Sequence, residues 1–196
     1  LLPKFHPGFH FKLRPIFIHL THMKKSDIKN MPVFFDRYIN LVDDLDVIAA
    51  LERYATIESI LDRSTCHALD GIRYAPGKWT IKDILLHLTD NERVQSYRAL
   101  RFARKDTTTL PGYDEELFAR NGNAENRTID DLIEEFRLAR QSTLSLYRSF
   151  TDEMLQQEGY AFKSQISVLA IAFVLVGHPI HHANVIRERY LPLIKQ

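Results

Sequence analysis

Apolar residues recur at intervals of three and four over most of the chain from about residue 43 onward, which is the spacing of amphipathic helices. The first apolar stripe is formed by Val47, Leu51, Tyr54, Ile57 and Leu61. A second helix is predicted to start at Thr80, an N-cap whose capping-box partner is Asp83, and to run to about Arg104. Between these two helices, Pro76 and Gly77 break the pattern.

Two further helices follow in the second half of the chain. Thr128 is a plausible N-cap for the third. Its apolar positions are Ile129, Ile133, Phe136, Thr143, Tyr147 and Phe150. The fourth is predicted to start near residues 164–167 and to end at about Tyr190, before Pro192. Alternating apolar and polar runs, which would indicate strands, are nearly absent.

Four helices of about 20 residues each predict an all-α fold, an up-down four-helix bundle. The connection between the second and third helices, residues 105–126, is too long for a tight turn and predicts a long crossover. A short helix is expected within it at Asp114–Ala119. Connections of this length are often functional, so the part around Tyr113 and Asp114 is expected to cover a site.

The N-terminal part of the chain differs from the rest. Residues 1–22 contain three prolines and no acidic residue, and they show no clear period. They also lack the compact apolar core of a signal peptide. We interpret residues 1–30 as an extension that packs poorly or lies outside the functional domain, and residues 31–196 as the bundle domain. Histidines without helical spacing, which are not expected to bind metal, are His6, His10, His19 and His22.

Composition narrows the functional classes. A formal net charge of +1, without a dense basic block, gives no reason to expect binding to nucleic acid or to an anionic membrane. The longest apolar run, residues 166–177, is shorter than the roughly 18 residues that a membrane span needs. The single cysteine, Cys66, favours a reducing, cytoplasmic location. Cys66 and the adjacent His67 are expected to be structural or exposed.

The stretch GHPIHH carries the candidate chemistry. Because each helical residue advances by about 100°, His178 and His182 lie about 40° apart and can point at one ion, whereas His181 lies at the edge of that face. A third ligand is expected from His87, on the inward stripe of the second helix. Three imidazoles leave coordination positions open, as in catalytic metal sites. The alternative is that these are core histidines that only form hydrogen bonds.

Proline 179 excludes one mechanism. A zincin peptidase requires the frame H-E-x-x-H, and here no glutamate follows His178. Because proline lacks an N–H, it also removes the hydrogen bond to the carbonyl of Leu175, and we predict a kink or bulge there. Nucleophile elbows, P-loops, dinucleotide fingerprints and paired Glu-x-x-His motifs are absent from the sequence.

Other polar residues lie on or beside the face of His87. The candidates for contacts with the ligands or substrate are His181, Asp90, Glu92, Arg93 and Tyr97. The alternative for each of the last four is a surface position or an ion pair within the bundle.

Three stretches together resemble the DinB superfamily: RYAPGKWTIKDILLHLTDNERVQSYRALRFARKD, LPGYDEELFA and ISVLAIAFVLVGHPIHHANVIRERYL. The resemblance covers about residues 32–192 and implies an up-down bundle with a long crossover. It implies a divalent metal, Zn or Ni, held by His87, His178 and His182, and often a homodimer. One departure is Pro179, where many members have glutamate.

The resemblance also sets the functional expectation. It implies a metal-dependent enzyme that acts on a small molecule, either as a thiol S-transferase using a low-molecular-weight thiol or as a hydrolase. The alternative is a metal-stabilised module for small-molecule binding or for interactions in a stress response, without turnover. Metal content and turnover are the properties that separate these possibilities.

Overall fold

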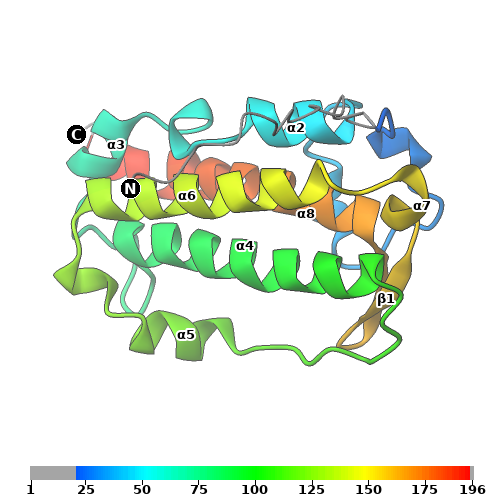
Figure 1. Ribbon diagram of the computed structural model, residues 1–196. Coiled ribbons are helices and arrows are strands. Elements are labelled where there is room, and N and C mark those ends of the chain that lie inside the picture. Colours follow the sequence, from blue (N-terminus) through cyan, green and yellow to red (C-terminus); the bar gives the residue numbers. More distant parts are fainter. Residues whose placement is uncertain (1–20, 195–196) are drawn as a thin grey trace, which may run out of the picture.

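Three long helices form the centre of the fold in the computed structural model, which describes residues 21–194 (Figure 1). They are α4 (Ile81–Ala103), α6 (Ile129–Tyr147) and α8 (Val168–Val185). Each begins at a hydroxyl side chain that accepts a hydrogen bond from a backbone N–H of the first turn, namely Thr80, Thr128 and Ser167. The predicted starts of α4 and α6 are confirmed, including the Thr80–Asp83 capping box.

The first arm of the bundle is not the continuous helix that the apolar stripe predicts. It consists of α1 (Asp36–Ile39), α2 (Val47–Arg53), η2 (Ile57–Ser59) and α3 (Arg63–Ala68). The chain leaves the helical conformation at Tyr54, and both Thr56 and Asp62 are extended or nearly so. Ile57 and Leu61 are nevertheless buried. The stripe therefore predicted burial correctly and helix continuity wrongly.

The long connection after α4 makes α4 and α6 run in the same direction. It carries η3 (Ala124–Asn126) and α5 (Glu115–Asn121), a short helix close to the one expected at Asp114–Ala119 and capped by Asp114. The connection returns along one side of the bundle (Figure 1). α8 runs the opposite way, so its first residue lies beside the last turn of α6, where the hydroxyl of Tyr147 donates to the carbonyl of Val168 at 3.0 Å. The predicted four-helix bundle with a long crossover is confirmed.

A two-stranded hairpin, not predicted from the sequence, precedes α8. After the short helix α7 (Asp152–Leu155), strand β1 (Glu158–Ala161) pairs antiparallel with β2 (Ser164–Ser167). Each strand has only four residues, too few for an alternating pattern to be recognised. The crossover joins the hairpin at Leu110, whose N–H donates to the carbonyl of Tyr160 and whose carbonyl accepts from the N–H of Phe162.

The residues just before the predicted domain start are packed. η1 (Lys25–Asp27) follows Met23, which is buried in the core and accepts a hydrogen bond from the N–H of Val47. Residues 21–30 of the predicted extension therefore contact the bundle, and the division of the chain after residue 30 stays a prediction. Of its four histidines, His22 lies beside Asp46, and the other three lie outside the described residues.

Helix α8 is apolar on all sides because other elements surround it. The segment Val168–Leu193 is long and apolar enough to span a membrane by composition, but 72% of its most apolar window is buried within the bundle. At Gly177 a Cβ atom would lie 2.0 Å from the carbonyl oxygen of Tyr38, so only glycine permits this approach of α1 to α8. Burial in the core explains the apolar run.

A buried ion pair lies at the centre of the bundle. The guanidinium of Arg140 on α6 donates to both carboxylate oxygens of Glu92 on α4, at 2.8 and 2.9 Å, and both side chains are almost fully buried. Arg140 also donates to the carbonyls of Tyr54, at 3.0 Å, and Leu175, at 2.7 Å. This second carbonyl is the one that Pro179 leaves without its helical donor.

Pro179 therefore does not interrupt the helix. α8 is continuous from Val168 to Val185, and the predicted bulge at Pro179 is wrong; a π-helical segment, η4 (Ile186–Tyr190), begins only after the end of α8. Arg140 replaces the missing backbone donor, so the carbonyl of Leu175 is satisfied without local unwinding.

We expect the substitution Glu92→Gln to lower the free energy of unfolding by about 3–5 kcal/mol, because it leaves the buried charge of Arg140 without its counter-ion. Urea denaturation followed by circular dichroism measures this loss. The control is Glu134→Gln, which removes an exposed ion pair with Arg137 and should change little. Equal effects of the two substitutions would contradict a central role of the Glu92–Arg140 pair.

Candidate metal centre

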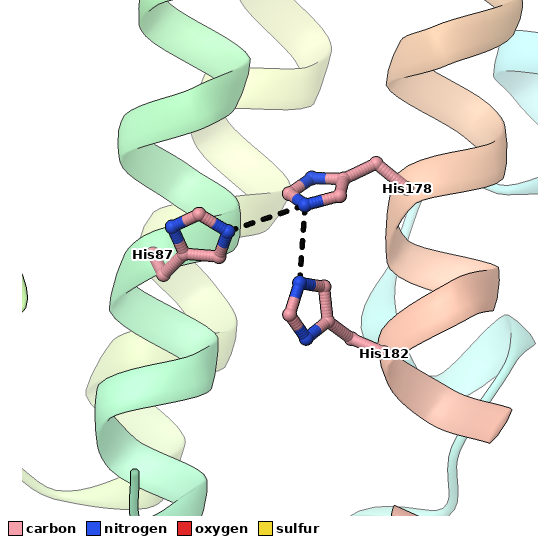
Figure 2. Close-up of side chains that lie close together, drawn as sticks. All are labelled: His87, His178 and His182. Atoms are coloured by element: carbon pink, nitrogen blue, oxygen red, sulfur yellow. Dashed lines mark hydrogen bonds between the residues drawn. The ribbon is translucent and has the colours of Figure 1, made fainter. Parts of the chain in front are cut away.

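Three histidines from two helices converge inside the bundle. His87 lies near the start of α4, and His178 and His182 lie one turn apart near the end of α8 (Figure 2). The Nε2 atom of His178 lies 3.2 Å from Nε2 of His87 and 3.0 Å from Nε2 of His182. One nitrogen of each ring lies within 4.8 Å of the other two. The structure thus brings together the three residues that helical geometry selects.

The chemistry of these three nitrogens fits a cation. A neutral imidazole nitrogen either donates one hydrogen bond or accepts one, so Nε2 of His178 cannot form two good hydrogen bonds with its two neighbours. Three lone pairs directed at one shared ion satisfy all three rings instead. Within residues 21–194 no carboxylate joins this group. The three histidines could therefore hold a divalent metal through nitrogen alone.

Burial keeps the three imidazoles neutral at physiological pH. Desolvation lowers the pKa of His87 to about 4 and that of His182, which is also near two other histidines, to about 3. His178 is as deeply buried as His87, and desolvation holds its pKa well below the usual value. Neutral rings offer the lone pairs that metal ligation requires.

Aromatic rings enclose the cluster. Trp79, just before α4, lies 4.7 Å from the ring of His87 and is nearly parallel to the ring of His182 at 6.3 Å. Its indole N–H donates to Glu116 at 3.1 Å. On the other side, the ring centroid of Tyr38 lies 5.0 Å from that of His178. These rings therefore pack against all three imidazoles.

His181 lies beside the cluster and not within it. Its ring centroid is 5.4 Å from the rings of both Tyr38 and His182, and it is only partly buried. Its pKa is lowered by desolvation and by the nearby charge of Arg37.

The structure does not bring the remaining sequence candidates to the histidines. Glu92 is fully engaged with Arg140 in the core. Arg93 is exposed and pairs with Glu135 and, more loosely, with Asp90. Tyr97 is exposed and accepts a hydrogen bond from Arg101. The alternative stated for these four residues therefore holds: they form ion pairs within the bundle or lie on its surface.

A cavity of about 400 Å³ opens beside His178. Its walls come from α1, α4, the crossover, the hairpin and α8. Aromatic, amide and charged side chains line it, among them Phe34, Tyr38, Gln95, Arg98, Tyr113, Glu115, Phe162 and Lys163. A smaller hollow of about 200 Å³ reaches His182 past Trp79 and Glu116. A larger hollow, of about 600 Å³, lies along Asp70, Arg73 and Arg120, and none of the three histidines lines it.

Several of these lining residues were missed by sequence reasoning. Gln95 and Arg98 continue the face of His87 and Asn91 along α4 at helical spacing, so the periodicity could have found them. Tyr38 and Phe162 come from segments with no helical period, and no sequence signal indicated them. The expected role of the crossover as a cover agrees with the position of Tyr113, whose hydroxyl accepts from the amide of Asn91 at 3.0 Å.

The family follows from a sequence comparison. The sequence profile of the DinB superfamily matches residues 36–186. The chain belongs to the DinB superfamily. The match contains all three converging histidines and excludes the N-terminal segment.

One sequence relative and one solved structure extend the comparison. A protein of Oceanobacillus iheyensis, whose name describes it provisionally as a metal-dependent hydrolase, is 27% identical over 111 residues; the match spans 56% of this chain and 63% of that relative's length. The solved structure of YfiT from Bacillus subtilis superposes on this chain with a TM-score of 0.55 and 20% sequence identity. The superposition covers 81% of this chain and 87% of YfiT. YfiT is described as a probable metal-dependent hydrolase with an unusual four-helix bundle topology. The second likeness shows a shared fold.

The position of Trp79 makes metal binding measurable. It is the single tryptophan of the chain and contacts the rings of His87 and His182. We expect added Ni²⁺ to quench its fluorescence, because an open-shell ion held beside an indole provides a non-radiative route for the excited state. His87→Ala should abolish the quenching, and His67→Ala, on the exposed end of α3, should preserve it. Equal quenching in both variants would contradict binding at the three histidines.

Proposed function

We propose that this protein is a metal-dependent enzyme acting on a small molecule. The observation that carries the proposal is the convergence of three neutral imidazoles, one of which, His178, lines a cavity large enough for a substrate. His87, His178 and His182 would hold a divalent ion and leave positions open towards the cavity. The names of the relatives support a hydrolase, and the resemblance to thiol-dependent family members supports an S-transferase.

A bound divalent ion would supply Lewis acidity, which makes a water molecule or a thiol easier to deprotonate. Imidazole ligands suit both Zn and Ni, and we propose one of these ions. The chain's own Cys66 is not the thiol that reacts: it is buried on α3, and burial raises its pKa to about 11. A thiol substrate would therefore come from solution.

Glu115 is the residue we propose as acid–base group. Pro179 provides no carboxylate beside His178, and Glu115 is the carboxylate that lines the same cavity within the described part of the chain. It lies at the start of α5 in the crossover. Desolvation raises the pKa of its carboxyl group, which improves its strength as a base near neutral pH. Glu115 would accept the proton that the nucleophile releases.

The alternative is a metal-stabilised binding module without turnover, which the enclosure of the cluster by Trp79 and Tyr38 would also suit. For either function we propose a homodimer, as the resemblance implies, and a cytoplasmic location, which a single buried cysteine permits. Light scattering on the purified protein measures the oligomeric state directly.

We expect protein prepared without an affinity tag to contain about one divalent ion per chain after growth with Zn or Ni. His87→Ala should lose the ion, because two imidazoles on one helix rarely suffice. His181→Ala, which changes a histidine outside the converging group, should keep it. Elemental analysis of the three proteins measures this, and an ion-free wild-type protein would contradict the proposal.

The same preparations separate the reaction classes. Each is assayed with ester and amide substrates, and with glutathione or cysteine plus an electrophile, before and after removal of the metal. A rate that needs metal alone supports a hydrolase, and one that needs both metal and thiol supports a transferase. Metal binding without turnover in either assay would support the alternative, a binding module that catalyses no reaction.

For Glu115→Gln we expect turnover to fall by roughly 100-fold with metal content unchanged, because the amide cannot accept the proton. The rate of the wild type should rise with pH as Glu115 deprotonates, and this rise should disappear in the variant. The control is Glu116→Gln, the next residue on α5, whose side chain contacts Trp79 instead. A variant Glu115→Gln that turns over at the wild-type rate would exclude this role.

A further inference from the structure

The cavity beside His178 contains a buried cation without a counter-ion. Arg98 on α4 is 5% exposed and lines this cavity. Among residues 21–194 it forms no ion pair, and the one hydrogen bond found for its guanidinium goes from Nη2 to the carbonyl of Pro111 at 2.8 Å. A guanidinium has five N–H donors, so most of its hydrogen-bonding capacity is free.

Burying a cation without a partner is costly, and the same protein shows the usual solution. Arg140, buried to a similar degree, forms a bidentate pair with Glu92 and donates to two carbonyls. Arg98 lacks such a pair, and desolvation lowers its pKa. The difference indicates that the counter-ion of Arg98 is supplied by a ligand.

A second polar group beside Arg98 is also unsatisfied. The side-chain oxygen of Gln95 is buried and has no hydrogen-bond partner among residues 21–194. Gln95 lies one turn before Arg98 on the same helix and lines the same cavity. Buried polar groups are normally paired, so this amide also points to a ligand atom.

The charges around the cavity favour an anion. Its lining includes two cations, Arg98 and Lys163, and one carboxylate, that of Glu115. Glu115 does not neutralise Arg98, because no ion pair joins them, and the cation that acts on its carboxyl group is Arg37. The buried charge of Arg98 is thus available to a ligand.

Two exposed aromatic side chains lie at the same cavity. Phe34 is 55% exposed and Phe162 is 60% exposed, and both have positive φ angles, of 80° and 57°. A bulky side chain rarely adopts this conformation, which costs free energy and is often retained at functional sites. Together with Tyr38 they provide an apolar wall for the body of a ligand.

We propose that Arg98 binds a carboxylate of the substrate, with Gln95 bonding a polar group next to it and Phe34, Tyr38 and Phe162 contacting the apolar part. The substrate is then an aryl or alkyl carboxylic acid, oriented with its reacting end towards His178. This inference rests on the proposed function, since it takes the cavity beside His178 as the substrate site.

The test compares acids with their neutral amides as ligands of the full-length protein. Binding of phenylacetate and phenylacetamide, and of butyrate and butyramide, is measured by titration calorimetry and by NMR line shifts. Both metal-free and zinc-loaded protein are used, so that binding to Arg98 is distinguished from binding to the ion. Because turnover is not measured, failure of this inference and failure of the proposed function are separable.

We expect each acid to bind metal-free protein more tightly than its amide. Arg98→Gln, which can still donate to Pro111, should weaken acid binding by roughly 10- to 100-fold, the range for a hydrogen bond to a charged group. Arg101→Gln, one turn further along α4 and paired with Asp106, should not change it. Equal affinities of acid and amide, or an unchanged affinity in Arg98→Gln, would overturn the proposal.

A second measurement uses wild-type protein and does not depend on the folding of a variant. Phenylglyoxal modifies arginine side chains, and peptide mass spectrometry locates the modified residues. We expect saturating phenylacetate, and not phenylacetamide, to protect Arg98, while exposed arginines react equally in all samples. Modification of Arg98 at the same rate with and without phenylacetate would overturn the proposal.

Discussion

One guanidinium, that of Arg140, connects all four arms of the bundle. It lies on α6, pairs with Glu92 on α4, and donates to the carbonyl of Tyr54 at the end of α2 and to that of Leu175 on α8. A buried ion pair gains little over apolar packing by itself, but it requires that its partners occupy one arrangement. Here that arrangement includes the relative position of α4 and α8, and these two helices supply the three histidines. The geometry of the candidate metal centre therefore depends on a polar contact outside it.

Pro179 is the reason that the carbonyl of Leu175 is free to accept a hydrogen bond from Arg140. A proline inside a helix normally leaves the carbonyl one turn earlier without a donor and often bends the helix. The structure provides a donor from a different helix, so α8 remains continuous beside His178 and His182. Pro179 places no carboxylate beside His178, and the cavity has one from Glu115 in the crossover instead. This is possible because α5 and α8 both border the same cavity.

Local signals in the sequence predicted local structure well. The predicted N-caps Thr80 and Thr128 are confirmed because a cap depends on residues at most three positions away. The same reasoning failed for residues 47–61, because a stripe at helical spacing records which side chains are buried and not whether the backbone between them stays helical. The short hairpin was missed since its strands are held by contacts with Phe102 and Leu110, which are distant in sequence.

For the candidate site too, features that depend on one helix were predicted, and features that depend on a facing element were not. Helical angles alone brought together His87, His178 and His182, and they placed His181 beside the group. They could not show that Glu92 is engaged by Arg140, or that Arg98 is buried without a carboxylate, because both facts depend on which residue of a facing element lies opposite. Whether a charged side chain is neutralised is a property of the assembled structure. For this reason the same helix face gave both a histidine that converges with the other two and charged residues that pair elsewhere.

The burial of α8 has a consequence for biosynthesis. This helix is the most apolar segment of the chain, and it follows both α4 and α6 in sequence. During translation the earlier arms emerge from the ribosome first, so the surfaces that cover α8 already exist when it is released. A chain order that placed α8 first would expose an apolar helix to chaperones and to the membrane-insertion machinery before any partner was available. The position of the core helix after its partners shortens that exposure and reduces the risk of mistargeting.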